Sequence, residues 1–129
     1  MTPSEQALRT RGEVAAEISN GIVKLFREAY GRGPVKAKTF LFDHYSLTVL
    51  EDTLTTAEST LVKAGRGDMV REFRLAFQTE MSVDFHHIVE RATGRKVQTY
   101  QSQIVFDPDH CFEIFVLDGP PAVSDEPGA

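Results

Sequence analysis

The fold is decided by residues 96–118, which read KVQTYQSQIVFDPDHCFEIFVLD. Residues 96–106 and 111–117 are rich in β-branched and aromatic side chains, a composition that is typical of strands. Between them, residues 107–110 (DPDH) have the proline and the aspartates of a tight turn. This stretch therefore predicts two antiparallel strands, and the second, more apolar strand is expected near the centre of a sheet.

The same layout occurs earlier in the chain. Residues 35–42 (VKAKTFLF) and 45–51 (YSLTVLE) predict two more strands, joined by a turn at Asp43-His44. Together, the two strand pairs predict a four-stranded antiparallel sheet.

Three helices are expected around these strand pairs. Residues 7–30 have apolar side chains every three or four positions and are followed by Gly31, a residue that favours helix ends. Residues 55–58 (TTAE) form a capping box, which predicts the start of a short helix. Asp68 is expected to cap a long helix over residues 69–93.

The resulting order, αββααββ, is typical of a two-layer α+β sandwich with its helices on one face of the sheet. The other face, to which we assign Tyr100 and one alternating set of residues 111–117, then needs a cover. A second copy of the chain is the simplest cover, so we expect a homodimer.

The composition fits one domain. The chain has 129 residues, of which 41% are hydrophobic and 26% charged. We place the domain at residues 8–118, after a flexible N-terminus at residues 1–7. Residues 119–129 (GPPAVSDEPGA) are rich in proline, glycine and acids and are expected to be a disordered tail. Because no apolar run approaches the roughly 20 residues of a membrane span and the N-terminus has no hydrophobic signal core, we expect a cytoplasmic protein.

The charge is unevenly distributed. The formal net charge is -5, but residues 9–38 hold seven basic and three acidic side chains, so this segment carries +4 and the remainder -9. The acidic total argues against a general duplex-binding protein. A surface for single-stranded nucleic acid, built from Phe40, Phe42 and Tyr45 beside basic residues, is an alternative. Aromatic side chains in such apolar strands favour core packing instead.

Glu80, Asp84 and His87 are the strongest candidates for a metal or acid–base site. Their spacings of four and three place two carboxylates and an imidazole on one helix face, and converging lone pairs of this kind bind zinc or iron. A solvated helix face explains the acids equally well. The single cysteine, Cys111, lies beside His110, but neighbouring residues of a strand point to opposite faces, so we expect a core cysteine rather than a nucleophile. No catalytic residue and no cofactor are predicted.

Three stretches carry a family resemblance. They are GEVAAEISNGIVKLFREAYGRGP (residues 12–34), LTTAES (54–59) and ATGRKVQTYQSQIVFDPDHCFEIFVLD (92–118). Together they resemble the MpsC family, named after a Na+-translocating membrane-potential-generating system, over residues 8–118. The second stretch departs from the family's usual L-T-P-A-E. The resemblance implies a bacterial accessory protein near ion or bicarbonate transport at the membrane, and it carries over no functional residue.

The sequence therefore favours a non-enzymatic cytoplasmic binding or regulatory domain that associates with itself and with a protein partner. The resemblance implies that this partner is a membrane protein. The alternative is a small metal-dependent enzyme that uses the helix face of Glu80, Asp84 and His87. Nucleic-acid binding is a third hypothesis.

Overall fold

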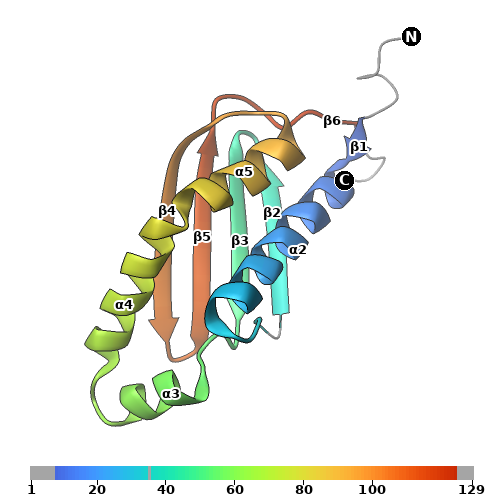
Figure 1. Cartoon of the computed structure of the whole chain (residues 1–129). Helices are drawn as coiled ribbons and strands as arrows, with labels where there is room; N and C mark the ends of the chain where they lie inside the picture. The colour runs from blue at the N-terminus through green and yellow to red at the C-terminus, as the bar shows by residue number, and fades with distance from the viewer. Residues whose placement is uncertain (1–7, 35, 125–129) are drawn as a thin grey trace.

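In the computed structural model, which describes residues 8–34 and 36–124, helices cover one side of a four-stranded sheet (Figure 1). The elements follow in the order β1 (Arg9–Thr10), α2 (Arg11–Tyr30), β2 (Lys36–Phe42), β3 (Tyr45–Glu51), α3 (Thr56–Lys63), α4 (Gly67–Glu80), α5 (Ser82–Thr93), β4 (Val97–Phe106), β5 (Asp109–Leu117) and β6 (Val123–Ser124). The expected α+β sandwich is confirmed. The four long strands lie where their sequence patterns placed them, to within two residues.

The sheet is antiparallel throughout, in the order β2-β3-β5-β4. β5 is an inner strand, as its apolar composition predicted, and it pairs with β3 and β4. The register places Thr48 opposite Glu113 and Leu50 opposite Cys111, so the side chains of the inner strands form rows across the sheet. β2 and β4 are the edge strands, and each has a side that no strand of this sheet pairs.

Capping boxes begin α2 and α3. The Thr55 hydroxyl accepts the N–H of Glu58, and the Glu58 carboxylate accepts the N–H of Thr55, as the sequence predicted. Thr10 and Glu13 make the same pair of hydrogen bonds, so α2 begins four residues later than its periodicity indicated. Asp68 does not cap α4 as expected, because this helix begins at Gly67, two residues before the expected start, and its N-cap residue Arg66 makes no side-chain cap.

Two helices, α4 and α5, replace the single helix expected over residues 69–93. The chain bends at Met81, which ends α4 and precedes α5 (Figure 1). The apolar spacing hides this break, since the buried residues on either side of it, Gln78 and Phe85, are seven positions apart, or about two helical turns.

The C-terminal segment differs from the tail expected over residues 119–129. The N–H of Ala122 donates to the carbonyl of Thr93 at 2.9 Å, and β6 pairs with β1 in parallel. Ordered structure therefore continues past the expected domain limit to Ser124. Residues 125–129 of the expected tail, and the expected flexible N-terminus at residues 1–7, lie outside the described residues.

The core lies between the helices and the face of the sheet that they cover. α2 and α5 approach each other closely at Gly21, where an added Cβ would lie 2.8 Å from Cγ2 of Ile88. The largest apolar side chains that are fully buried in this layer are Phe26, Phe85, Phe115, Ile18, Ile22, Leu50 and Leu117.

Candidate functional site

Arg74 on α4 is the largest fully buried side chain in the described part of the chain. Its Nε donates to Oε2 of Glu58 at 2.7 Å, and its Nη2 donates to Oε1 at 2.6 Å. Nη2 also donates to the carbonyl of Thr53 at 2.8 Å, and the guanidinium lies 3.9 Å from the ring centre of Tyr30. Burial alone would raise the pKa of Glu58, but the hydrogen bonds and charge of Arg74 hold this pKa below its usual value. Arg74 thus ties α4 to α2, to α3 and to the segment before α3.

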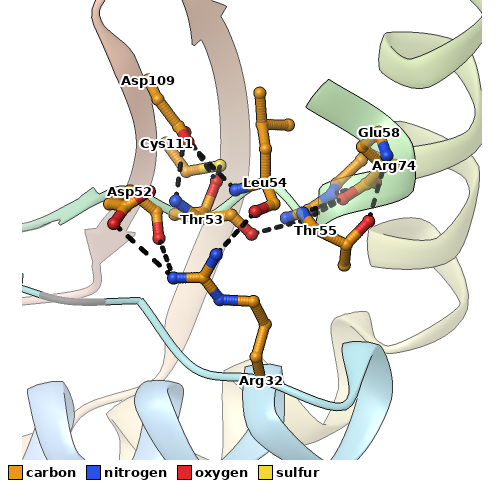
Figure 2. Close-up of polar contacts among 9 residues, drawn as sticks. All are labelled: Arg32, Asp52, Thr53, Leu54, Thr55, Glu58, Arg74, Asp109 and Cys111. Carbon is orange, nitrogen blue, oxygen red and sulfur yellow. Dashed lines mark hydrogen bonds and ion pairs between the residues drawn. The ribbon is translucent and has the colours of Figure 1, made fainter. Parts of the chain in front are cut away.

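That segment, residues 52–55, is held from two further sides (Figure 2). The Asp109 carboxylate accepts the N–H of Thr53 at 3.1 Å and the N–H of Leu54 at 3.0 Å. Arg32 donates to the carbonyl of Leu54 at 2.8 Å. Because these contacts join parts of the same chain, the cluster fixes the path from β3 to α3.

A second buried acid, Glu113, lies on the covered face of the sheet. The Tyr100 hydroxyl donates to Oε2 of Glu113, and the Ser102 hydroxyl lies 3.0 Å from Oε1. The assignment of Tyr100 to the other face is therefore wrong, and its hydrogen bond to a buried carboxyl gives the physical reason. Burial raises the pKa of Glu113 to about 7, although the hydrogen bonds of Tyr100 and Ser102 and the charge of Arg74 lower it. Near neutral pH, both protonation states of this carboxyl are populated.

The protonation of Glu113 is linked to the orientation of a buried amide. Ser102 Oγ is within hydrogen-bond distance of Glu113 Oε1 and of Gln78 Oε1, yet a hydroxyl has one hydrogen to donate. Both contacts are satisfied when Glu113 is protonated and donates to Ser102. When Glu113 is ionised, they are satisfied only if the Gln78 amide turns its NH₂ group toward Ser102.

The three residues predicted as a metal site are not gathered into one group. Glu80 is the last residue of α4, whereas Asp84 and His87 lie on α5, beyond the bend at Met81. Asp84 and His87 line a hollow between α2 and α5 that does not include Glu80. Within residues 8–34 and 36–124, no three His, Cys, Asp or Glu side chains lie close enough together to hold a metal ion. The spacing argument assumed one continuous helix, and the bend interrupts it.

Cys111 and His110 point to opposite faces of the sheet, as strand geometry predicted. The Cys111 thiol is buried 3.5 Å from Oγ1 of Thr53, and burial raises its pKa to about 11. The His110 ring stacks with that of Phe112 on the other face. A thiol with a raised pKa is a weak nucleophile at neutral pH, because little thiolate is present.

The face of the sheet turned away from the helices has no cover among the described elements, and we call it the open face (Figure 1). Phe40 and Phe42 on this face are 42% and 53% exposed, so the core packing expected for them is wrong. The reason is strand alternation, because Thr39 and Leu41 take the covered side of β2. From β2 to β4, the central rows of the open face are Lys38, Val49, Phe112 and Gln103; Phe40, Leu47, Ile114 and Gln101; and Phe42, Tyr45, Val116 and Thr99.

Arg74, Gln78 and Glu113 are absent from the candidates that the sequence suggested. These three residues could have been found from their positions in the repeating pattern of buried residues, rather than from their residue types. Arg74 and Gln78 lie four positions apart on the buried stripe of α4, and Glu113 alternates with Cys111 and Phe115 on β5. A polar residue at a position where the pattern places buried side chains predicts a buried polar network.

None of the helices in the described part of the chain has both the length and the hydropathy of a membrane span.

The chain resembles known proteins at the level of a family model. No curated protein and no solved structure matches the chain. Residues 10–119 match the family model described as "Na+-translocating membrane potential-generating system (MpsC)". Since this match spans nearly all of the α+β domain, the chain belongs to the MpsC family.

Proposed function

We propose that this chain is a non-enzymatic binding domain that self-associates through its open face and serves as an accessory component of a Na+-translocating membrane-potential-generating system. The open face is the observation that carries self-association. Four strands about 4.8 Å apart, taken over the seven-residue stretch of about 24 Å in which β2, β3 and β5 pair, present roughly 450 Å² of sheet. A largely apolar patch of this size is as large as the largest patch on a typical monomeric protein, and such patches often serve a function.

A second copy is the cover that the charge pattern supports. Lys36 and Lys38 lie on β2 at one end of the open face, and Glu51 lies opposite Lys36 on β3. A two-fold axis places the same patch of two copies face to face, so the lysines of one copy can meet the glutamate of the other. The apolar centre then becomes buried on both copies, which provides the main driving force.

The mass of the protein in solution tests self-association. We expect sedimentation equilibrium to give a dimer for the natural chain and a monomer for Phe42→Glu, because burial of an unpaired carboxylate at the interface is costly. Phe73→Glu is the matched control, since Phe73 on α4 is 56% exposed, close to the 53% of Phe42, but lies on the helical side. A monomeric natural chain, or a Phe42→Glu variant that stays dimeric with unchanged circular dichroism, would contradict the proposal.

The accessory role, which the family description supports, is tested in cells that contain the transport system. Cells without this chain are expected to lose the part of their membrane potential that depends on external Na+. The natural chain and Phe73→Glu should restore this part, whereas Phe42→Glu should not. An equal potential in cells with and without the chain, in Na+ medium, would rule the role out.

A further inference from the structure

A groove of about 480 Å³ runs along the edge strand β4, on the side of the sheet that the helices cover. Its floor is formed by five consecutive residues of β4, from Gln98 to Ser102. Its wall is formed by the end of α4 and the start of α5, which lie beside this edge in Figure 1. The residues that line the wall are Leu75, Gln78, Thr79, Ser82 and His86.

Backbone hydrogen-bonding groups of β4 face this groove. On β5, the N–H of Leu117 donates toward β3, to the carbonyl of His44 at 2.8 Å. Neighbouring residues of a strand direct their N–H and C=O groups to opposite sides. The odd-numbered residues of β5 therefore bond to β3, and the even-numbered residues, such as Ile114, bond to β4. Their partners on β4 have odd numbers, as in the pair of Gln101 with Ile114. Tyr100 and Ser102 therefore direct their N–H and C=O groups outward, and no described residue bonds these groups.

The two edges of the sheet are protected to different degrees. β2 carries Lys36 and Lys38, and lysines on an edge strand oppose pairing with other chains. β4 has ten residues, VQTYQSQIVF, without a charge or a proline. At its far end, Nη2 of Arg71 reaches the carbonyl of Ile104 at 3.5 Å. The stretch of β4 whose outward backbone groups have no partner among the described residues is thus the part that forms the groove.

The lining of the groove disfavours an occupant with charged side chains, and the helices beside it disfavour a bulky occupant. None of its ten lining residues is Asp, Glu, Lys or Arg, so a charged side chain placed against the wall would be desolvated without a partner. The last five residues of the chain, DEPGA, carry two acids and a proline and do not fit this chemistry. A second copy paired through β4 would bring its own α4 toward the helical wall beside the edge, whereas an extended chain brings no helix to this place.

We propose that β4 accepts an extended, uncharged segment of a partner protein, which adds to the sheet as a fifth strand in the groove beside α4 and α5. The outward groups of Tyr100 and Ser102 supply the backbone hydrogen bonds, and addition of a strand to a sheet edge is a recurring mode of peptide recognition. Alternate side chains of the segment meet Gln78, Thr79 and Ser82. The groove shares only Thr99 and Gln101 with the open face, and its other lining residues lie on the helical side, so the proposal rests on the β4 edge and not on self-association.

The probe is a phage-displayed library of random seven-residue peptides, selected on the full chain. We expect the selected peptides to share uncharged, alternating segments rich in β-branched residues. Thr79→Arg, which fills the groove, should weaken the best synthetic peptide at least about tenfold, while Ala76→Arg, at an exposed position of α4 outside the groove, should leave binding unchanged. N-methylation of the peptide at residues that face β4 should also weaken binding about tenfold, and N-methylation at the alternating positions should not.

Amide hydrogen exchange reports the register directly. On peptide binding, the amides of Tyr100 and Ser102 should become protected, whereas those of Gln101 and Gln103, already bonded to β5, should change little. The proposal is overturned if no peptide is enriched, if Thr79→Arg binds as well as the natural chain, or if Tyr100 and Ser102 remain unprotected in the complex. Loss of peptide binding on dimer formation through β4 would assign the edge to a second copy instead.

Discussion

Replacement of Glu113 by glutamine is expected to stabilise the folded chain at high pH but not at low pH. Burial raises the pKa of this carboxyl from its ordinary value of 4.5 to about 7 in the folded state. A raised carboxyl pKa means that folding disfavours the ionised form. The resulting cost in the free energy of folding is absent below pH 4.5 and grows as the pH rises. Above the folded pKa the cost is complete, and at about 1.4 kcal/mol per pKa unit it amounts to roughly 3 kcal/mol.

The Glu113→Gln variant removes this cost and keeps most of the local hydrogen bonds. Its amide oxygen accepts from the hydroxyl of Tyr100 or Ser102, and its NH₂ group donates to the other hydroxyl, at a loss of about 1 kcal/mol. The variant should therefore be about 1 kcal/mol less stable than the natural chain near pH 4.5. Near pH 8.5 it should be about 2 kcal/mol more stable, with the crossover between these limits.

Urea unfolding of both proteins across this pH range measures the difference in the free energy of unfolding. All other titrating groups contribute equally to both proteins and cancel in the difference. Glu80→Gln is the control, since Glu80 is exposed at the end of α4 and should give no such pH dependence. A difference between Glu113→Gln and the natural chain that stays constant with pH would refute the assignment of a buried, ionisable Glu113.

Three further predictions concern the polar interior. Arg74→Met should lower the free energy of unfolding by about 3 to 5 kcal/mol, because Glu58 keeps a buried charge without its partner. Glu58→Gln in the same chain should recover part of this loss in urea unfolding. Asp109→Ala should cost about 2 to 3 kcal/mol through the lost backbone contacts before α3, whereas the exposed Asp107→Ala should change stability by less than about 0.5 kcal/mol. Cys111, whose pKa is raised to about 11, should react with Ellman's reagent only as fast as the chain unfolds, and rapid labelling of the native protein would contradict its burial.

The strands could be predicted because their signals are local. The tight turn at Asp107-Pro108 separates two runs of strand-forming residues, and the Asp43-His44 turn does the same for the first pair. The strand order was not predictable, since the chain passes through α3, α4 and α5 between the two pairs, and no local signal states which strands then become neighbours. The bend at Met81 was hidden for a related reason, because a periodic pattern reports which face is buried and not whether the helix axis is straight.

The candidate sites were harder to predict, because each depends on a choice between two faces. Both alternating sets of β5 are apolar, Phe112 with Ile114 on one side and Cys111 with Phe115 on the other, so hydropathy alone could not say which side the helices cover. The decisive clue is Glu113, which a solvent-facing strand would place outward. It lies instead on the covered side, where groups from separate elements, Tyr100 and Ser102 on β4 and Arg74 on α4, act on it. Because Glu113 and the residues that alternate with it on β5 face the helices, Phe112 and Ile114 are left on the open face. An exposed apolar face of this kind makes association with another molecule favourable.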